Sequence, residues 1–253
     1  MHLILTGATG LCGSGVLDAM LRRTDISRIT ILSRRPVAMA TDRKDPRVNV
    51  VLHSNFEEYD KELLQQLKGA AGCVWALGIS QTQVSKEDYV KITKTFTMAA
   101  AEAFQAIETE NGKPFNFVYV SGLGATLTPG RFTPIFGRVK GETELALAEL
   151  RKKNPSFHAM SMRPGGIDST GHDAINPYVP KLRLFEGTVI TLLGPALRVA
   201  LKSSWSPTPL LGQFLVQMAM GERDDIKGAG VEKVGELPII ENSAFRRVLD
   251  ESQ

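Results

Sequence analysis

Three glycines near the start of the chain are spaced as a phosphate-binding turn requires. An apolar strand predicted over residues 2–6 runs directly into the turn, and a helical pattern over residues 11–23 follows it. Glycines three residues apart allow a tight turn and a close approach of the backbone to a pyrophosphate, which then lies on the amides at the helix N-terminus. The turn therefore predicts a dinucleotide site, built from Gly7, Thr9, Gly10, Leu11, Cys12 and Gly13.

The second predicted strand, over residues 28–33, ends in a hydroxyl and two arginines. A site for NAD(H) usually places Asp or Glu at the end of this strand, where the carboxylate binds the ribose 2′-hydroxyl. Here Ser33, Arg34 and Arg35 stand at that position. Guanidinium groups offer planar, bidentate donors to a phosphate, whereas a carboxylate would repel it. We therefore predict NADP(H) as the cofactor; the alternative interpretation is a solvated basic loop.

Strand patterns and helical patterns alternate over the first two thirds of the chain. Short apolar strands are predicted over residues 2–6, 28–33, 48–52, 73–76, 115–120 and 157–162. Helical patterns are predicted over residues 11–23, 59–68, 83–110 and 137–153. Such alternation predicts an α/β fold, in which a Rossmann-type doubly wound parallel sheet carries helices on both faces. We expect residues 1–253 to form one such domain.

The pattern changes after Pro164. Turn residues are dense there, and helical patterns return at about 182–201 and 208–220, before a short apolar segment at 237–240. These elements include too few strands for a second sheet. Residues 165–235 are therefore expected to form a small, mainly helical cap over the carboxyl ends of the parallel strands, where open α/β sheets bind ligands.

Composition limits the partners and the compartment. Hydrophobic residues make up 43% and charged residues 23% of the chain, as in ordinary globular domains. A net charge of +3, without a basic run among aromatics, argues against nucleic acid. Cys12 and Cys73 form neither a disulfide framework nor a metal site, so the reducing cytoplasm is expected. No charged leader precedes the first strand, and the apolar run 187–200 is short and contains Arg198, so no stable membrane insertion is predicted.

The glycine turn, Thr-Gly-x-x-Gly-x-x-Gly over residues 6–13, resembles that of extended and atypical short-chain dehydrogenase/reductases. Further matches follow in the family's order up to about residue 167. Ala-Leu-Gly at 76–78 resembles the segment along the cofactor's ribose, and Met-Arg-Pro-Gly at 162–165 resembles the loop that closes over the nicotinamide. The resemblance implies cofactor contacts from Leu77, Gly78, Pro164 and Gly165. Asn55 stands where the family often faces the adenine with Asp; the alternative interpretation is an Asn in a turn.

The same resemblance implies an active site from which one member is missing. Residues 118–121 resemble the strand that ends in the active-site serine, which binds the substrate oxygen and is here Ser121. The segment Lys-Gly-Glu at 140–142 resembles the helix with the active-site lysine, and it implies that Lys140 holds the nicotinamide ribose. Together with Leu-Ser-Arg-Arg at 32–35 and Arg-Pro-Gly at 163–165, it is similar to atypical, Tat-interacting-protein-like and epimerase-like members. The family's proton-donating tyrosine lies four residues before this lysine, and Phe136 has no proton to donate.

Each of these two residues also has an ordinary structural interpretation. Ser121 could cap a strand end locally, and Lys140 could be a surface helix lysine four residues before Glu144.

Three interpretations of Phe136 stay open. In the first, which we adopt, the protein is a reductase whose proton comes from another group, either a water relayed by Ser121 or a side chain in the loop after the last core strand. That loop contains Asp168, His172, Asp173 and Tyr178. In the second, the protein binds NADP(H) but orients a reactive molecule for isomerisation or cyclisation. In the third, it is a cofactor-dependent sensor without turnover, because fold alone does not determine function.

The C-terminal third supplies apolar side chains for a ligand pocket. They are Leu182, Leu184, Phe185, Val189, Ile190, Leu192, Leu193, Leu197 and Trp205. Because most of them also serve a local core, they indicate the character of a ligand and not its identity. No cluster of Lys or Arg there suggests a nucleotide-sugar diphosphate. The sequence therefore predicts an NADP(H)-dependent reductase that acts on a small, mainly apolar organic molecule.

Overall fold

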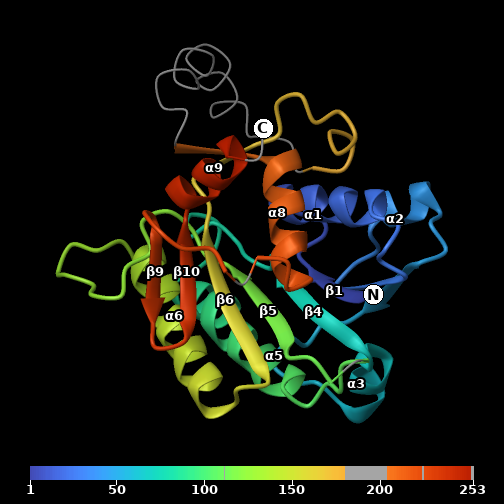
Figure 1. Cartoon of the computed structure of the whole chain (residues 1–253), viewed down its shortest axis with the longest axis horizontal. Coiled ribbons are helices and arrows are strands. Elements are labelled where there is room, and N and C mark those ends of the chain that lie inside the picture. The colour runs from blue at the N-terminus through green and yellow to red at the C-terminus, as the bar shows by residue number, and fades with distance from the viewer. Residues whose placement is uncertain (111, 180–203, 224, 252–253) are drawn as a thin grey trace.

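An eight-stranded sheet forms the centre of the computed structural model, which describes residues 1–110, 112–179, 204–223 and 225–251 (Figure 1). The strands are ordered β3-β2-β1-β4-β5-β6-β10-β9, and all neighbours pair in parallel except β9 and β10. Their bounds are β1 His2–Thr6, β2 Arg28–Ser33, β3 Val48–Leu52, β4 Ala70–Trp75, β5 Phe115–Val120, β6 Phe157–Arg163, β9 Val231–Val234 and β10 Leu237–Glu241. The predicted α/β, Rossmann-type doubly wound fold is confirmed.

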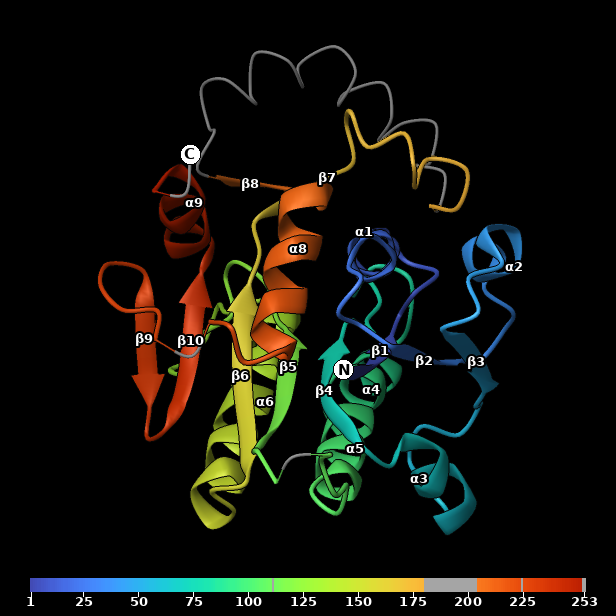
Figure 2. The same cartoon turned by 45° about the vertical axis from the view of Figure 1, so that its right-hand side comes forward.

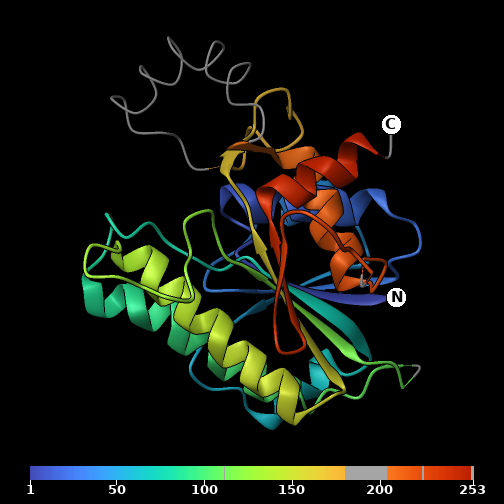
Figure 3. The same cartoon turned by 60° about the vertical axis from the view of Figure 1, so that its left-hand side comes forward.

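Helices cover both faces of this sheet (Figure 2). On one face lie α1 Leu11–Arg22, α2 Ala38–Arg43, α8 Thr208–Ala219 and α9 Asn242–Asp250. On the other lie α3 Lys61–Leu67, α4 Lys86–Val90, the π-helix η1 Lys91–Thr95, α5 Phe96–Phe104 and α6 Ile135–Lys153. Figure 3 shows α5 and α6 running side by side across this second face.

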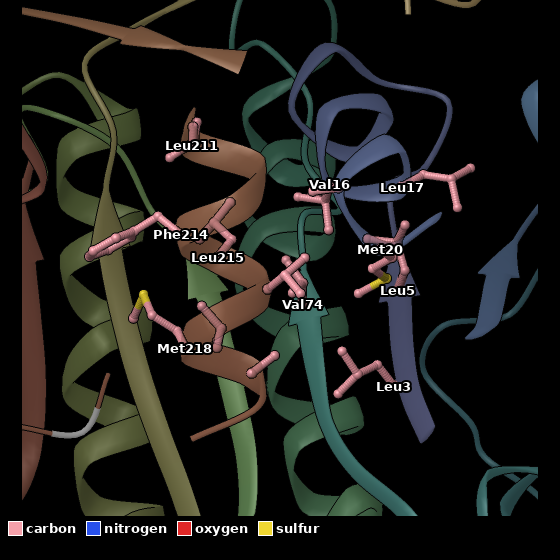
Figure 4. Packing of buried hydrophobic residues seen from close by; sticks show 14 of the residues in the cluster. Leu3, Leu5, Val16, Leu17, Met20, Val74, Leu211, Phe214, Leu215 and Met218 are labelled. Atoms are coloured by element: carbon pink, nitrogen blue, oxygen red, sulfur yellow. The ribbon is translucent and has the colours of Figure 1, made fainter. Parts of the chain in front are cut away.

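Side chains of successive strand residues alternate between two cores. In β1, Leu3 and Leu5 belong to the core under α1 and α8, where they pack near Val74 (Figure 4), whereas Ile4 belongs to the core under α5 and α6. A strand buried on both faces is therefore apolar at most positions, which is why these segments are recognisable in the sequence as short apolar runs.

Helices α1 and α8 touch at the level of their backbones. A Cβ atom at Gly212 would lie 2.3 Å from the carbonyl oxygen of Gly15, so only glycine fits at this contact. The contact fixes α8 in the helical layer beside the helix that begins at the glycine turn.

The boundaries differ most from the predictions in three places. Strand β4 begins at Ala70, three residues earlier than expected. The helix predicted over 83–110 consists of α4, η1 and α5 in succession, and it ends at Phe104. Helix α2 was not predicted; it is a short helix of six residues.

The C-terminal third contributes more to the main sheet than the sequence indicates. β10 pairs in parallel with β6, and β9 completes the edge, while α8 lies in the helical layer. A separate two-stranded sheet joins β7 Gly166–Asp168 to β8 Trp205–Pro207. The helical pattern at 182–201, and the apolar side chains expected from Leu182 to Leu197, lie outside the described residues. In the part of the chain that the structure describes, every helix is too short or too polar to cross a bilayer.

Candidate cofactor and active site

A cavity of about 670 Å³ opens at the carboxyl ends of β1, β2, β4 and β5. This is the edge of the sheet at which the strand order reverses direction, and open α/β sheets bind ligands in the crevice at that point. All the residues predicted for the glycine turn line it, as do Ser33, Arg34, Arg35, Leu77, Gly78, Ser121 and Lys140. The fold thus brings together residues as far apart in the sequence as Gly7 and Lys140.

The glycine turn is shaped so that backbone, not side chains, faces the cavity. Gly7 has φ of 71°, and a Cβ atom there would lie 2.2 Å from the carbonyl oxygen of Ala76. A Cβ atom at Gly13 would lie 2.1 Å from the carbonyl oxygen of Gly7. Helix α1 begins after Gly10 without a side-chain cap or an acidic residue in its first turn. Its first amides are therefore available to an anion, so the turn fits a pyrophosphate.

Cys12 faces the same cavity as a neutral group. Burial raises the pKa of its thiol to about 12. The thiol is therefore protonated at neutral pH, and it fills space beside the turn without opposing a phosphate.

The end of β2 presents two exposed guanidinium groups to the cavity. Arg34 and Arg35 are both exposed, and neither forms an ion pair with any residue that the structure describes. The Ser33 hydroxyl donates to the carbonyl oxygen of Arg35 at 2.7 Å, which holds the turn that carries them. Two uncompensated positive charges beside a phosphate-binding turn fit a further phosphate group.

Lys140 is held against the end of β5. Its Nζ donates to the carbonyl oxygens of Ser121 at 2.7 Å and Val120 at 3.2 Å, and it lies 5.5 Å from the centre of the Tyr119 ring. Burial lowers the pKa of Lys140 to about 8, although the nearby Glu144 carboxylate favours its charged form. The side chain is a partly buried cation in the cavity and not a solvated surface lysine.

Ser121 lines the cavity with an unpaired hydroxyl. Its Oγ is buried and has no hydrogen-bond partner in the described structure. The local capping bond considered from the sequence is therefore not formed. A buried hydroxyl without a partner in a cavity is suited to a ligand oxygen, because leaving it unpaired costs free energy.

Glu144 anchors the helix that carries Lys140. Its fully buried carboxylate accepts hydrogen bonds from Arg163 Nε at 3.0 Å and Ser161 Oγ at 2.8 Å. Arg163 in turn donates to Glu241 Oε1 at 2.7 Å. This network joins α6 to β6 and β10, and it fixes the height of Lys140 above the sheet.

Phe136 stands apart from the cavity. Its ring lies against Gly124, where a Cβ atom would be 3.2 Å from the ring, and its backbone N–H donates to Gln81 Oε1 at 3.1 Å. It is not among the residues that line the cavity.

The loop after β6 does not supply the expected proton donors. His172 is buried between Thr208 Oγ1, at 2.9 Å, and Asp18 Oδ2, at 3.1 Å. Tyr178 interacts with Asp42 on α2. None of the four polar residues proposed from this loop lines the cavity, so the expectation that they face the nicotinamide is corrected: the loop packs on α1 and α2 instead, and Ile167 alone reaches the cavity from this segment.

Three predicted cofactor residues lie outside the cavity lining. The side chain of Asn55 accepts from the N–H of Glu57 at 3.2 Å, as a turn residue does. The carbonyl of Pro164 accepts from the Leu123 N–H at 2.8 Å. Gly165 lies beside β8, where its N–H donates to Ser206 Oγ at 3.0 Å.

Sequence reasoning missed several residues that line the cavity. Tyr89 at the end of α4 and Thr93 in η1 both reach it, as do Phe56, Ser80 and Gln83. Tyr89 and Thr93 are four residues apart, the spacing at which polar side chains share one helix face. The spacing of Tyr89 and Thr93 is the signal in the sequence that could have identified them as cavity residues. It lies within the segment 83–110, which was predicted to be one continuous helix.

Two curated fungal proteins are similar to the chain, whereas no protein family model matches it. It is 34% identical over 254 residues to the leucinostatins biosynthesis cluster protein T of Purpureocillium lilacinum, covering 93% of this chain and 91% of that protein. It is 47% identical over 153 residues to the botcinic acid biosynthesis cluster B protein 16 of Botryotinia fuckeliana, covering 60% of this chain and 97% of that protein.

Solved structures share the fold at low sequence identity. The PhqB reductase domain from Penicillium fellutanum has a TM-score of 0.65 at 16% identity, over 88% of this chain and 65% of that one. The Bordetella bronchiseptica enzyme WbmF, in complex with NAD⁺, has a TM-score of 0.62 at 12% identity, over 99% of this chain and 77% of that one. A Burkholderia thailandensis oxidoreductase has a TM-score of 0.61 at 15% identity, over 99% of this chain and 96% of that one.

Proposed function

Because the chain belongs to the short-chain dehydrogenase/reductase superfamily, as an atypical member, we propose that it is an NADP(H)-dependent reductase of a small, mainly apolar organic molecule. One observation carries this proposal. A single cavity joins the glycine turn and the arginines after β2 to Ser121 and Lys140. The first two features bind a phosphorylated dinucleotide, and the last two act on the atom that reacts.

The cofactor is held by three groups of residues in this proposal. The amides at the start of α1 bind the pyrophosphate. Arg34 and Arg35, with the Ser33 hydroxyl, bind the 2′-phosphate, for which guanidinium groups are better donors than for a free ribose hydroxyl. Lys140 binds the nicotinamide ribose. When bound, the dihydronicotinamide supplies a hydride to an electrophilic carbon.

Ser121 and Lys140 prepare the reacting oxygen. The unpaired Ser121 Oγ donates a hydrogen bond to the substrate oxygen, which polarises the carbonyl group. Lys140 adds a positive charge beside the same oxygen, and the two backbone carbonyls that it contacts keep it in place. A charge fixed in a partly buried site stabilises a developing oxyanion more strongly than one in water.

The substrate is proposed to be an apolar metabolite. The two fungal relatives are named for biosynthesis clusters, which supports a role in tailoring a small natural product. Leu123, two residues after Ser121, is 51% exposed, and it offers an apolar surface in the segment that follows β5. The free thiols of Cys12 and Cys73 fit a reducing compartment, and we propose the cytoplasm.

The test is oxidation of NADPH with a panel of apolar ketones, aldehydes and cyclic imines, followed at the nicotinamide absorbance band. We expect turnover with at least one substrate and a product heavier by two hydrogens in mass spectrometry. Ser121→Ala and Lys140→Met should each lower kcat by roughly 10²- to 10⁴-fold. The exposed Thr128→Ala is the matched control and should leave the rate unchanged.

A second candidate function follows from Phe136, which removes the family's proton donor. The protein could bind NADP(H) and shape a molecule for isomerisation or cyclisation without redox turnover. In that case NADPH binds, the nicotinamide absorbance stays constant, and the product has the mass of its substrate. That outcome would overturn the reductase proposal.

A further inference from the structure

We infer that Tyr89 donates the proton in this site, in place of the tyrosine that Phe136 replaces. The inference deepens the proposed reductase function and rests on it. Its basis is the position of the chain's four tyrosines, all of which lie in the described part of the structure.

Only two of the tyrosines line the cavity. Tyr59 packs between His53 and Phe104, with ring centres 5.1 and 5.3 Å away, against the core under α5 and α6, and it does not line the cavity. Tyr178 does not line the cavity, and its hydroxyl interacts with Asp42 on α2. Tyr89 and Tyr119 remain, and both border the cavity that holds Lys140.

Tyr119 presents its ring, not its hydroxyl, to the reacting groups. Its hydroxyl is buried and forms no hydrogen bond in the described structure. The Lys140 ammonium lies 5.5 Å from the centre of its ring, a cation–π distance. Tyr119 therefore contributes its ring to the cavity wall beside Lys140, while its hydroxyl is buried.

Tyr89 is placed by local features of its helix. The Ser85 hydroxyl caps the start of α4 through the N–H of Asp88 at 3.0 Å, and the N–H of Tyr89 donates to the Ser85 carbonyl at 2.9 Å. The π-helical turn η1 follows at once, and such turns are frequent at functional sites. It brings Thr93 to the cavity beside Tyr89.

The protonation states of Tyr89 and Lys140 at neutral pH suit a proton donor and a neighbouring cation. Burial raises the pKa of the Tyr89 phenol more than its contact with Thr93 lowers it, so the phenol is protonated at neutral pH. Lys140, with a pKa of about 8, is charged at the same pH. An acid that carries its proton thus shares a cavity with a cation that can compensate the charge it leaves behind.

Reduction of a carbonyl substrate transfers one hydride to its carbon and one proton to its oxygen. The carbonyl carbon accepts the hydride that NADPH supplies, and negative charge develops on the oxygen that Ser121 binds. The O–H bond of Tyr89 breaks as a new O–H bond forms at this oxygen, which gives the alcohol. The phenolate is compensated by Lys140 and takes a proton from water.

The decisive comparison uses one substrate that needs a proton and one that does not. A ketone needs both a hydride and a proton, whereas an N-alkylated iminium ion needs only a hydride. Tyr89→Phe should lower kcat for a ketone by about 10²- to 10⁴-fold, yet change kcat for the iminium by less than about threefold. Tyr59→Phe, a tyrosine outside the cavity, is the matched control and should leave both rates unchanged.

Two readouts do not depend on turnover. NADPH affinity, measured by fluorescence, should be the same in Tyr89→Phe as in the unmodified protein. In an ultraviolet pH titration of the free protein, Tyr89→Phe should remove a phenol transition that saturating NADPH shifts. Tyr59→Phe should retain that transition.

The outcomes separate this inference from the function on which it rests. If the unmodified protein reduces both substrates and Tyr89→Phe reduces the ketone equally well, Tyr89 is not the donor while the reductase proposal stands. An equal loss with ketone and iminium would show a structural role and would overturn the inference. If the unmodified protein reduces neither substrate, the reductase proposal fails, and this inference fails with it.

Discussion

The ammonium group of Lys140 is held by the backbone carbonyls of Val120 and Ser121 at the end of β5. Its charge changes within the pH range in which enzymes are usually assayed. Burial lowers its pKa to about 8, so the side chain is cationic below that pH and neutral above it. Unlike an exposed lysine, it loses its charge in mildly alkaline solution.

We predict an alkaline limb in the pH profile of kcat/KM, with an apparent pKa of about 8. As pH rises through this value Lys140 loses its proton, so its hold on the ribose and its compensation of the oxyanion are both lost. kcat/KM reports groups of the free enzyme. Lys140→Arg keeps a charge at every accessible pH, and it should abolish the limb even if its rate is lower. A limb that persists unchanged in Lys140→Arg would assign it to another group.

A second prediction concerns Phe136. Because its ring rests on Gly124 and does not line the cavity, Phe136→Tyr should change kcat by less than about threefold. It should not restore activity to Tyr89→Phe when the two are combined. Steady-state kinetics of the single and double variants provide the measurement. A strong gain in either background would mean that the family's proton donor had merely been lost and not relocated.

At the scale of single residues, the sequence allowed prediction of those site residues whose role depends on their immediate neighbours. The glycine turn and the arginines after β2 were predictable because spacing and charge are visible in a few residues. Tyr89 was not predictable, because its importance comes from the π-helical turn that follows it and from a cavity that the ends of four strands form. Likewise, the buried position of His172 beside Asp18 depends on Thr208 of α8, which is distant in the sequence.

At the scale of elements, the position of α6 depends on one buried network. Glu144 is fully buried, and Arg163 has a side chain only 5% exposed, so each needs the other. The pair joins α6 to β6, and Glu241 extends it to β10. A lysine four residues before Glu144 thereby acquires a fixed position.

We predict that Arg163→Met lowers the free energy of unfolding by about 3–5 kcal/mol, because it leaves the Glu144 carboxylate buried without its partner. Combining it with Glu144→Met should recover part of the loss, since two apolar side chains can replace a buried ion pair. Urea denaturation measures both, with the exposed Lys152→Met on the same helix as control. An effect of Arg163→Met no larger than that of the control would contradict the role given to this network.

The element boundaries show where sequence patterns stop being informative. Strands β1 and β2 match their predicted ranges because burial on both faces makes most of their residues apolar, and the partly exposed edge strand β3 matches through its Val and Leu residues. The π-turn within the long helical pattern has no such signature, since it changes hydrogen bonding and not hydrophobicity. β10 is a short strand that contains a proline, and only its pairing with β6, far away in the sequence, makes it part of the sheet.

At the scale of the whole molecule, the sheet order sets the location of the site. The chain builds β1, β2 and β3 outward on one side and then returns to place β4 beside β1 (Figure 2). The cavity lies where these two directions diverge. Residues that follow four different strands therefore meet at one edge. The alternation of strands and helices made this arrangement predictable. The strands β10 and β9, which extend the sheet beyond β6, were not predictable from it.

The central claim is that this cavity holds a nicotinamide dinucleotide with a 2′-phosphate. The most direct measurement is a fluorescence titration of the purified protein with NADPH and with NADH, repeated on Arg34→Ala/Arg35→Ala and on the exposed Arg131→Ala as control. We predict that NADPH binds at least about tenfold more tightly than NADH, that the double variant loses this preference by weakening NADPH alone by roughly 10- to 100-fold, and that the control retains it. Equal affinity for the two cofactors, or tighter binding of NADH, would contradict the account.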